Sequence, residues 1–234
     1  MRALLLPVKL RDNAKQRLAS LLSPDDRRSL MSAMIADGFA AARAARAAER
    51  VYVVTADAGI AAMAEGFGWR VIRETAQTSE SASVDAASLI CASEGVTALL
   101  RLPLDLPCVS GGDIDAVFAV EADVVIVPSR DGTGTNAILR SPPGLFPSHF
   151  GPDSLGKHQA EAAQMGARLR LLANGNIAMD VDDAADLQAL LAFASGGAMG
   201  GAMGGATGAW LEARPELVRH LGGSAKVAGS GSAA

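Results

Sequence analysis

The chain has 234 residues, of which half are hydrophobic and only 4% are aromatic, and its formal net charge at pH 7 is −4. This length suits one α/β domain with a tail, and the negative charge excludes a general attraction to nucleic acid. Two cysteines are too few for a disulfide framework. The sequence shows no secretory leader and no apolar run near the ~20 residues of a membrane helix, so we expect a cytoplasmic protein without a membrane partner.

Strand and helix patterns alternate through the first half of the chain. Short apolar runs predict strands at residues 3–8, 51–55, 70–72, 98–102 and 123–128. Helical patterns lie between them, at about 24–48, 57–66, 83–94 and 110–121. Ser23 and Pro24 begin the first helix, because Ser is a favoured N-cap and Pro a favoured first helical residue. This alternation favours a single Rossmann-like α/β domain, in which helices flank a mainly parallel sheet.

The second half is less regular. Strands are expected at 136–140 and 168–172, and helices at 153–165 and 183–193. We place the domain at residues 1–194, followed by a flexible linker rich in Gly, Ala and Met at 195–209. The last segment, 210–234, is expected to hold a short helix at 210–221 and a disordered end.

A basic loop follows the first strand and contains Lys9, Arg11, Lys15 and Arg17. A doubly wound fold collects its ligands at the carboxyl ends of its strands, where this loop would lie. Lys and Arg can neutralise triphosphate oxygens, so Lys9, Lys15 and Arg17 are candidate contacts for a nucleoside triphosphate. The loop lacks the glycines and the Gly-Lys-Ser/Thr ending of a Walker A motif, and a solvated basic loop is the alternative.

Asp105 stands between two prolines, directly after the apolar strand at 98–102. A carboxylate at such a rigid turn is well placed to bind a metal at the edge of the sheet, although an Asx-type turn would also explain it. Magnesium needs only one or two carboxylates beside phosphate oxygens and water. Asp180 and Asp182 occupy alternate positions and would face the same way, so they are the candidate partners of Asp105 around Mg²⁺. Asp183 is expected to cap the helix that follows.

Two further segments could bind an anion. Residues 131–136, Asp-Gly-Thr-Gly-Thr-Asn, contain glycines that let the backbone approach a ligand and threonines that add hydroxyl donors, with an ordinary glycine turn as the alternative. Residues 150–154, Phe-Gly-Pro-Asp-Ser, precede a helix whose first amides suit a phosphate or carboxylate. His149 beside them is explained more simply as a surface or packed histidine than as a ligand or proton donor. His158 and His220 are assigned no function.

Taken in this order, the segments resemble the 2-phospho-L-lactate guanylyltransferase family of coenzyme F-420 biosynthesis, which includes phosphoenolpyruvate-using members. The resemblance covers about residues 3–193 and rests on the basic loop, Leu-Pro-Leu-Asp-Leu-Pro at 102–107, both anion-binding segments and Asp-Val-Asp at 180–182. It implies a nucleotide-diphospho-sugar transferase-like fold and dependence on Mg²⁺. It also implies transfer of GMP from GTP to phosphoenolpyruvate, 2-phospho-L-lactate or 3-phosphoglycerate, with release of pyrophosphate.

The resemblance implies roles for single residues as well. Lys9 would contact the triphosphate and would act in catalysis together with Asp105. Three aspartates would surround the metal, namely Asp105, Asp180 and Asp182. Three residues of the anion-binding segments would hold the phosphorylated acid, namely Thr135, Gly151 and Ser154.

One segment departs from the family pattern. Family members usually carry Gly-Leu-Asn-Ala at the start of the helix after the third strand, where this chain has Gln-Thr-Ser-Glu-Ser-Ala-Ser-Val-Asp at 77–85. This region borders the base in related transferases, which makes Glu80 and Ser83 candidate nucleotide contacts. Glu80 or Asp85 could accept hydrogen bonds from a guanine edge, and helix capping by Ser81 or Ser83 explains the segment equally well.

Two other functions compete with this one. A nucleotidyltransferase for a molybdopterin or sugar-phosphate acceptor would be expected to carry a Gly-x-Gly-x-Arg loop after the first strand, and this chain does not. A non-catalytic nucleotide-sensing protein on the same fold would have no need of the complete acidic set at Asp105, Asp180 and Asp182. The sequence leaves open which acid is the acceptor and whether the protein is a homodimer.

Overall fold

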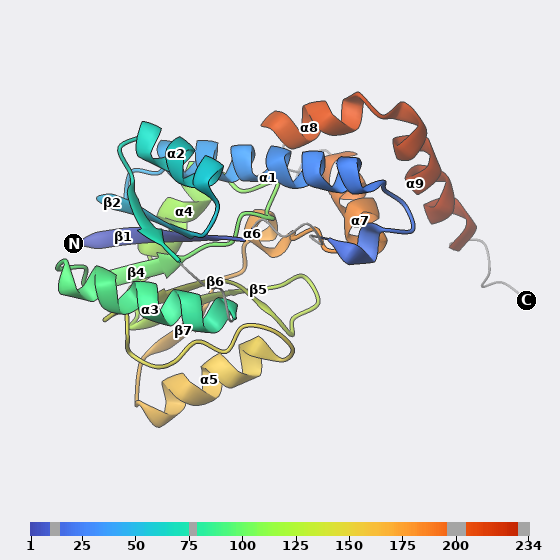
Figure 1. The fold of residues 1–234 in the computed structure, drawn as a ribbon. Coiled ribbons are helices and arrows are strands. Elements are labelled where there is room, and N and C mark those ends of the chain that lie inside the picture. The colour runs from blue at the N-terminus through green and yellow to red at the C-terminus, as the bar shows by residue number, and fades with distance from the viewer. Residues whose placement is uncertain (10–14, 75–78, 196–204, 229–234) are drawn as a thin grey trace, which may run out of the picture.

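The computed structural model of the chain describes residues 1–9, 15–74, 79–195 and 205–228. In these residues, seven strands form one sheet in the order β3-β2-β1-β4-β6-β5-β7 (Figure 1). They are β1 (Arg2–Val8), β2 (Arg50–Thr55), β3 (Arg70–Arg73), β4 (Ala98–Arg101), β5 (Val124–Pro128), β6 (Thr135–Arg140) and β7 (Leu169–Leu171). β6 runs antiparallel to β4 and β5, and the other pairs are parallel. The predicted α/β fold with a mainly parallel sheet is confirmed.

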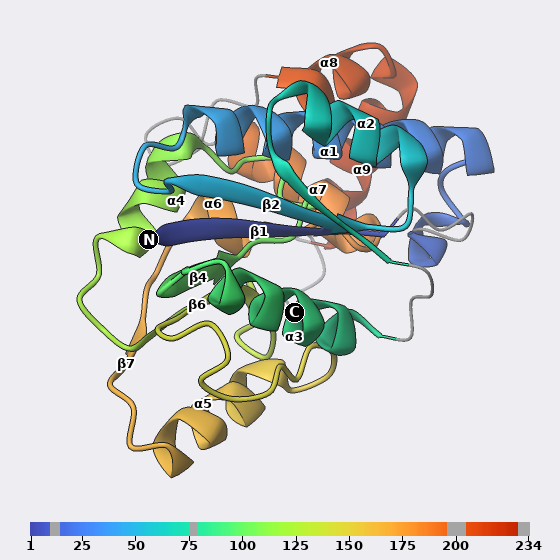
Figure 2. The same cartoon turned by 60° about the vertical axis from the view of Figure 1, so that its left-hand side comes forward.

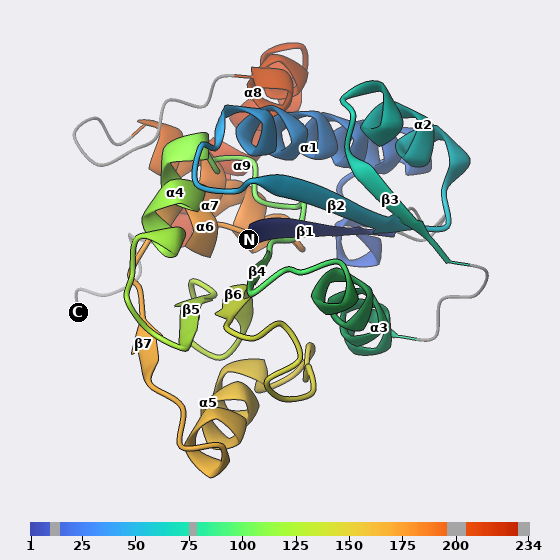
Figure 3. The same cartoon turned by 90° about the vertical axis from the view of Figure 1, so that its left-hand side faces the viewer.

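Helices cover both faces of the sheet, as Figures 1 and 3 show. One face carries α1 (Pro24–Ala44), α2 (Ala58–Gly66) and α4 (Gly111–Phe118), and the other carries α3 (Glu80–Ser93) and α5 (Ser154–Gln164). Successive side chains of a strand point to opposite faces. Leu4 and Leu6 of β1 therefore pack with α1, whereas Ala3 and Leu5 pack with α3. Burial on both faces explains why β1 is a continuous apolar run.

α1 begins as predicted, because Ser23 Oγ accepts a hydrogen bond from the Asp26 N–H at 3.1 Å. The helix ends at Ala44 instead of near residue 48. The chain turns there because Asp115 of α4 accepts hydrogen bonds from two backbone N–H groups just beyond the helix, each at 2.8 Å. A contact between distant segments therefore ends this helix, and local sequence spacing could not show it.

The C-terminal segment forms two helices, α8 (Gly205–Glu212) and α9 (Pro215–Ala228), where one helix at 210–221 was expected. Pro215 is the first residue of α9, a position where its missing N–H costs no helical hydrogen bond. Of the expected linker at 195–209, residues 205–209 belong to α8 and residues 196–204 lie outside the described ranges.

α8 packs on α1, as Figures 1 and 2 show. Trp210 of α8 belongs to the same hydrophobic cluster as Leu30 and Met34 of α1. Asp37 of α1 is buried and accepts hydrogen bonds from the N–H groups of Ala206 (2.6 Å) and Thr207 (2.8 Å). These are first-turn amides of α8, so Asp37 caps that helix from the neighbouring one. The C-terminal segment is thereby part of the folded body.

Three further elements belong to the described residues, namely the 3-10 turn η1 (Gln16–Leu18), α6 (Gly175–Ala178) and α7 (Ala184–Ser195). The predicted cap of α7 is confirmed, because Asp183 accepts hydrogen bonds from the N–H groups of Ala185 (2.9 Å) and Asp186 (3.1 Å). Across the part of the chain that the structure describes, no helix is both long and apolar enough to cross a membrane.

Candidate active site

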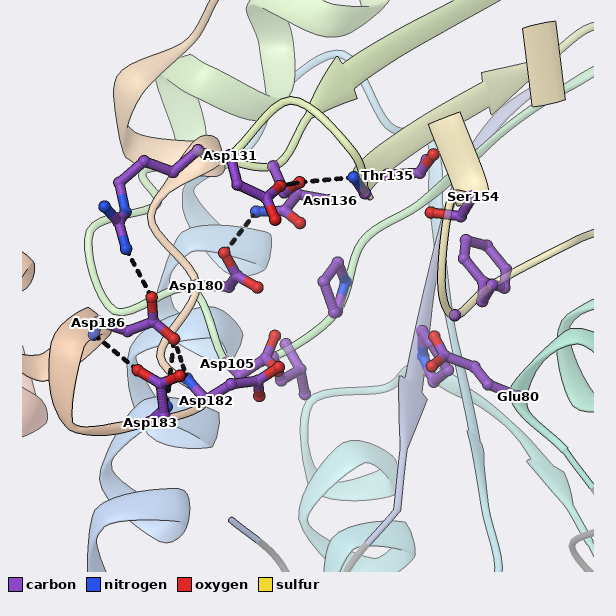
Figure 4. Close-up of a pocket in the computed structure, with 18 of the residues that line it drawn as sticks. Glu80, Asp105, Asp131, Thr135, Asn136, Ser154, Asp180, Asp182, Asp183 and Asp186 are labelled. Carbon is purple, nitrogen blue, oxygen red and sulfur yellow. Dashed lines mark hydrogen bonds and ion pairs between the residues drawn. The ribbon is translucent and has the colours of Figure 1, made fainter. Parts of the chain in front are cut away.

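A pocket of about 790 Å³ opens at the edge of the sheet where β1 and β4 end (Figure 4). Because β6 runs antiparallel, its first residue, Thr135, lies at this same edge and brings the preceding loop with it. Most of the residues that line the pocket belong to the segments 7–9, 101–105, 129–136, 150–154 and 180–186. Motifs far apart in the sequence therefore meet in one place, at the edge where doubly wound folds bind ligands.

Two of the predicted metal ligands share one cation of the chain. Lys15 Nζ donates to Asp105 Oδ2 at 2.8 Å and to Asp182 Oδ1 at 2.6 Å. Burial lowers the pKa of Lys15, but the two carboxylates outweigh it and raise that pKa above its ordinary value. Burial raises the pKa of Asp105, and the ammonium outweighs that effect and lowers it below the usual range. Lys15 and Asp105 are therefore both charged near neutral pH, and Lys15 holds the carboxylates of Asp105 and Asp182 together.

Asp180 lies beside this pair. Asn136 Nδ2 donates to Asp180 Oδ1 at 3.1 Å and to the Ile177 carbonyl at 2.9 Å. Burial, together with the negative charges of Asp105 and Asp182, raises the pKa of Asp180 above its ordinary value. The three predicted carboxylates therefore gather on one side of the pocket, as Figure 4 shows.

This donor set suits a hard divalent cation, because such ions bind carboxylate oxygens. The ammonium between Asp105 and Asp182 shows that these two carboxylates can hold positive charge between them. As the side chains stand in the described residues, no three or more His, Cys, Asp or Glu groups are arranged to hold a metal by themselves. A cation here would need further oxygens from a bound phosphate or water, which is the way Mg²⁺ usually binds.

The basic loop is divided between two positions. Lys9 and Arg17 line the pocket, as expected for residues that would meet a triphosphate. Lys15 points to the carboxylates, where the sequence predicted a nucleotide contact. Arg11 lies outside the described residues.

The wall across the pocket from the aspartates carries a buried cation. Figure 4 shows Glu80 on the side opposite Asp182. Arg101 of β4 is buried there, with its guanidinium 4.1 Å from the ring centre of Phe150. It pairs with Glu80 and donates from Nη1 to the Asn136 carbonyl at 3.1 Å. Positive charge is thereby held in this wall by an aromatic ring and a carboxylate.

The three residues expected to hold a phosphorylated acid all line the pocket, namely Thr135, Gly151 and Ser154. Gly151 has a φ of 116°, a conformation that residues with a side chain rarely adopt. Ser154 begins α5, and the Leu155 N–H donates to the Thr133 carbonyl at 3.0 Å. This bond joins the start of α5 to the glycine loop, so the two predicted anion-binding segments form one surface.

Thr135 has a partner that sequence reasoning missed. Its Oγ1 lies 3.0 Å from Nδ1 of His158, which is fully buried in α5. The sequence signal at His158 is its spacing from Ser154 and Ala162, four residues on either side, which indicates one buried helix face. That spacing explains why His158 is buried, but only the folded chain shows that it touches the pocket wall.

Within residues 79–85 of the segment that departs from the family pattern, some side chains line the pocket and others make structural contacts away from it. Ser79 caps α3, so the helix begins at Glu80, which lines the pocket. Ser83 is buried and donates to the Ser79 carbonyl at 2.9 Å, which does not fit its expected nucleotide contact. Asp85 accepts the Ser148 N–H at 3.0 Å and so holds a neighbouring loop. Residues 77 and 78 lie outside the described ranges.

The sequence is similar to those of known guanylyltransferases. Residues 1–199 match the family described as "Guanylyl transferase CofC like". A phosphoenolpyruvate guanylyltransferase from Conexibacter woesei is 37% identical over 202 residues, which are 83% of this chain and 90% of that protein. A 2-phospho-L-lactate guanylyltransferase from Methanothermobacter thermautotrophicus is 30% identical over 194 residues, 82% of this chain and 85% of that protein.

Comparison with solved structures supports the fold. A putative nucleotide-diphospho-sugar transferase from Desulfovibrio desulfuricans superposes with a TM-score of 0.76 over 94% of this chain and 97% of that one, at 17% identity. A nucleotidyl transferase from Methanothermobacter thermautotrophicus superposes with a TM-score of 0.58 at 15% identity, over 81% of this chain and 95% of that one. At these identities the likeness concerns the fold alone.

Proposed function

Because the chain belongs to the CofC-like guanylyl transferase family, we propose that it transfers GMP from GTP to a small phosphorylated acid and releases pyrophosphate. The observation that carries this proposal is one pocket with two unlike sides. Asp105, Asp180 and Asp182 gather on one side, and Thr135 and Ser154 line the other; Gly151 lines the pocket as well. The more similar of the two relatives named above is called a phosphoenolpyruvate guanylyltransferase, so we propose phosphoenolpyruvate as the acceptor and coenzyme F-420 biosynthesis as the pathway.

The proposed reaction forms one bond and breaks one bond at the α-phosphorus of GTP. A phosphate oxygen of the acid attacks that phosphorus in line. The bond from the α-phosphorus to the bridging oxygen breaks, and pyrophosphate leaves with the electron pair. A phosphate monoester is already a nucleophile near neutral pH, so the pocket needs no strong general base, and positioning and charge supply most of the rate.

Each side of the pocket has a task in this reaction. Three aspartates would hold Mg²⁺, which would neutralise phosphate charge when bound: Asp105, Asp180 and Asp182. Lys9 and Arg17 line the pocket and would bind triphosphate oxygens. The buried guanidinium of Arg101 adds positive charge beside the residues that would hold the acid.

A screen of pyrophosphate release tests this proposal. Four nucleoside triphosphates are combined with phosphoenolpyruvate, 2-phospho-L-lactate and 3-phosphoglycerate, each with and without Mg²⁺, and the product is identified by mass spectrometry. We expect release only with GTP, an acid and Mg²⁺ together. Turnover with another nucleotide or with a sugar phosphate would favour a different nucleotidyltransferase. GTP binding without turnover would favour a nucleotide sensor.

The variant Asp105→Asn separates the carboxylate's charge from its shape. It should lower kcat/KM by roughly 100-fold or more, since a preorganised charge is lost at the reacting phosphates. Asp25→Asn is the matched control, because the Asp25 side chain is 88% exposed at the start of α1 and does not line the pocket. Near-normal turnover of the folded Asp105→Asn protein would contradict the proposed metal role.

A further inference from the structure

Two hydrogen bonds orient the buried ring of His158. Its Nε2 lies 2.9 Å from the backbone N–H of His149, and its Nδ1 lies 3.0 Å from Thr135 Oγ1. The ring is fully buried between the start of β6 and the loop before α5. Thr135 in turn lines the pocket, so the histidine stands directly behind the pocket wall.

The backbone bond determines which nitrogen carries the proton. A backbone N–H can only donate, so Nε2 of His158 must accept and carries no hydrogen. A neutral imidazole then has its hydrogen on Nδ1. Burial, with help from nearby cations, lowers the pKa of His158 to about 3, so the ring is neutral at physiological pH. Nδ1–H is therefore a donor, and Thr135 Oγ1 accepts from it.

The hydroxyl of Thr135 then has a defined direction. A hydroxyl carries one hydrogen and two lone pairs, and one lone pair is used by the histidine. His158 cannot take the hydroxyl hydrogen, because its Nδ1 already bears one. Among the described residues, the hydrogen-bonding partner of this hydroxyl is His158. The O–H is therefore left to donate toward the pocket.

We propose that His158 is a positioning residue that makes the Thr135 hydroxyl a hydrogen-bond donor to the acceptor acid. The inference rests on the proposed function, in which Thr135 contacts that acid. Phosphate and carboxylate oxygens near neutral pH accept hydrogen bonds, so they need a donor and are repelled by a lone pair. Ser154 lies one turn before His158 on the same buried face, so α5 delivers both residues to this wall.

Conservative variants separate this role from packing. Thr135→Val keeps the shape and removes the hydroxyl, and it should raise KM for the acid about 10- to 100-fold, since a hydrogen bond to a charged group is lost. His158→Gln places an amide near the Nε2 position and loses the donor to Thr135, so it should raise the same KM about 10-fold. His158→Asn places an amide nitrogen near the Nδ1 position and should restore much of the loss. In each variant KM for GTP should change less than about twofold.

A double-mutant cycle tests whether His158 acts through Thr135. If it does, Thr135→Val with His158→Gln should have the same KM for the acid as Thr135→Val alone. Multiplied effects in the double variant, or an equal rise in KM for GTP, would overturn the inference and indicate packing. His149→Ala is the control, because it removes a neighbouring ring but keeps the N–H that binds His158.

The protonation of the two ring nitrogens of His158 can be measured by NMR without any assay of enzyme activity. Nitrogen-15 NMR of the histidine-labelled protein at pH 7 should show His158 with a protonated Nδ1 and an unprotonated Nε2. The opposite tautomer, or a protonated ring, would overturn the inference even in an active enzyme. If the wild type transfers no GMP to any acid, the proposed function and with it the role in acceptor binding fail, and the NMR result still decides the hydrogen-bond direction.

Discussion

Acidification should destabilise the protein through His158, and the size of the effect follows from the buried site. Burial and neighbouring cations lower the pKa of His158 from 6.5 to about 3. The unfolded chain binds a proton at this position as the pH falls through about 6.5, whereas the folded protein does not until the pH approaches about 3. Stability is therefore unaffected above the upper value and is lost progressively between the two. Burial is the largest cause, and the side chains of Arg140, Arg101 and Lys157 supply the nearby positive charge.

At pH 5 the loss should be about 2 kcal/mol, because that pH lies about 1.5 units below the unfolded pKa and each unit corresponds to about 1.36 kcal/mol. The assay is urea unfolding at pH 7.5 and pH 5, followed by circular dichroism, for the wild type and His158→Gln. Other titrating groups contribute to both proteins and largely cancel in the difference. The wild type should lose about 2 kcal/mol more than the variant. Equal losses would refute the claim that His158 is buried in its neutral form.

Two further predictions concern packing. Asp37→Ala removes the cap of α8 and should lower the free energy of unfolding by about 1–2 kcal/mol. Fluorescence should then show Trp210 becoming exposed at a lower denaturant concentration than in the wild type. An unchanged unfolding midpoint would show that the cap contributes nothing. Gly111→Ala would place a Cβ 2.6 Å from the backbone carbon of Ala44 and should cost about 1–3 kcal/mol in thermal unfolding. Gly112→Ala is its control, since the added Cβ would lie 3.7 Å from Ser110 Oγ, and equal stability of the two variants would contradict the close approach of α4 to α1.

The local signals in the sequence were reliable where neighbouring residues decide the outcome. Ser23 and Asp183 cap their helices as predicted, because a cap bonds backbone groups only two or three residues away. The strand β1 could also be predicted from its apolar run, since burial on both faces leaves a continuous hydrophobic pattern. Asp105 was placed correctly at the end of a strand and in the pocket.

Features that depend on contacts between distant residues, such as helix starts and strand direction, were predicted less accurately. Helix α3 is capped by Ser79, which accepts a hydrogen bond from the Ala82 N–H at 3.1 Å, where Ser81 or Ser83 had been expected as the cap. A single C-terminal helix was expected at 210–221, whereas α8 begins at Gly205, and the Asp37 carboxylate that caps α8 lies far back in the sequence. The pattern at 136–140 indicated a strand but not its antiparallel direction, which pairing with β4 and β5 decides.

The fold class and the family could be predicted from the sequence, because these rest on periodicity and on motifs of a few adjacent residues, and the same motifs predict the metal-binding carboxylates and the anion-binding segments. The tertiary structure alone decided how those residues act on one another. It placed the Lys15 ammonium between Asp105 and Asp182, and it placed His158 behind Thr135. Both contacts join residues many positions apart, and their direction depends on burial and on single hydrogen bonds. Neither leaves a repeating pattern in the chain.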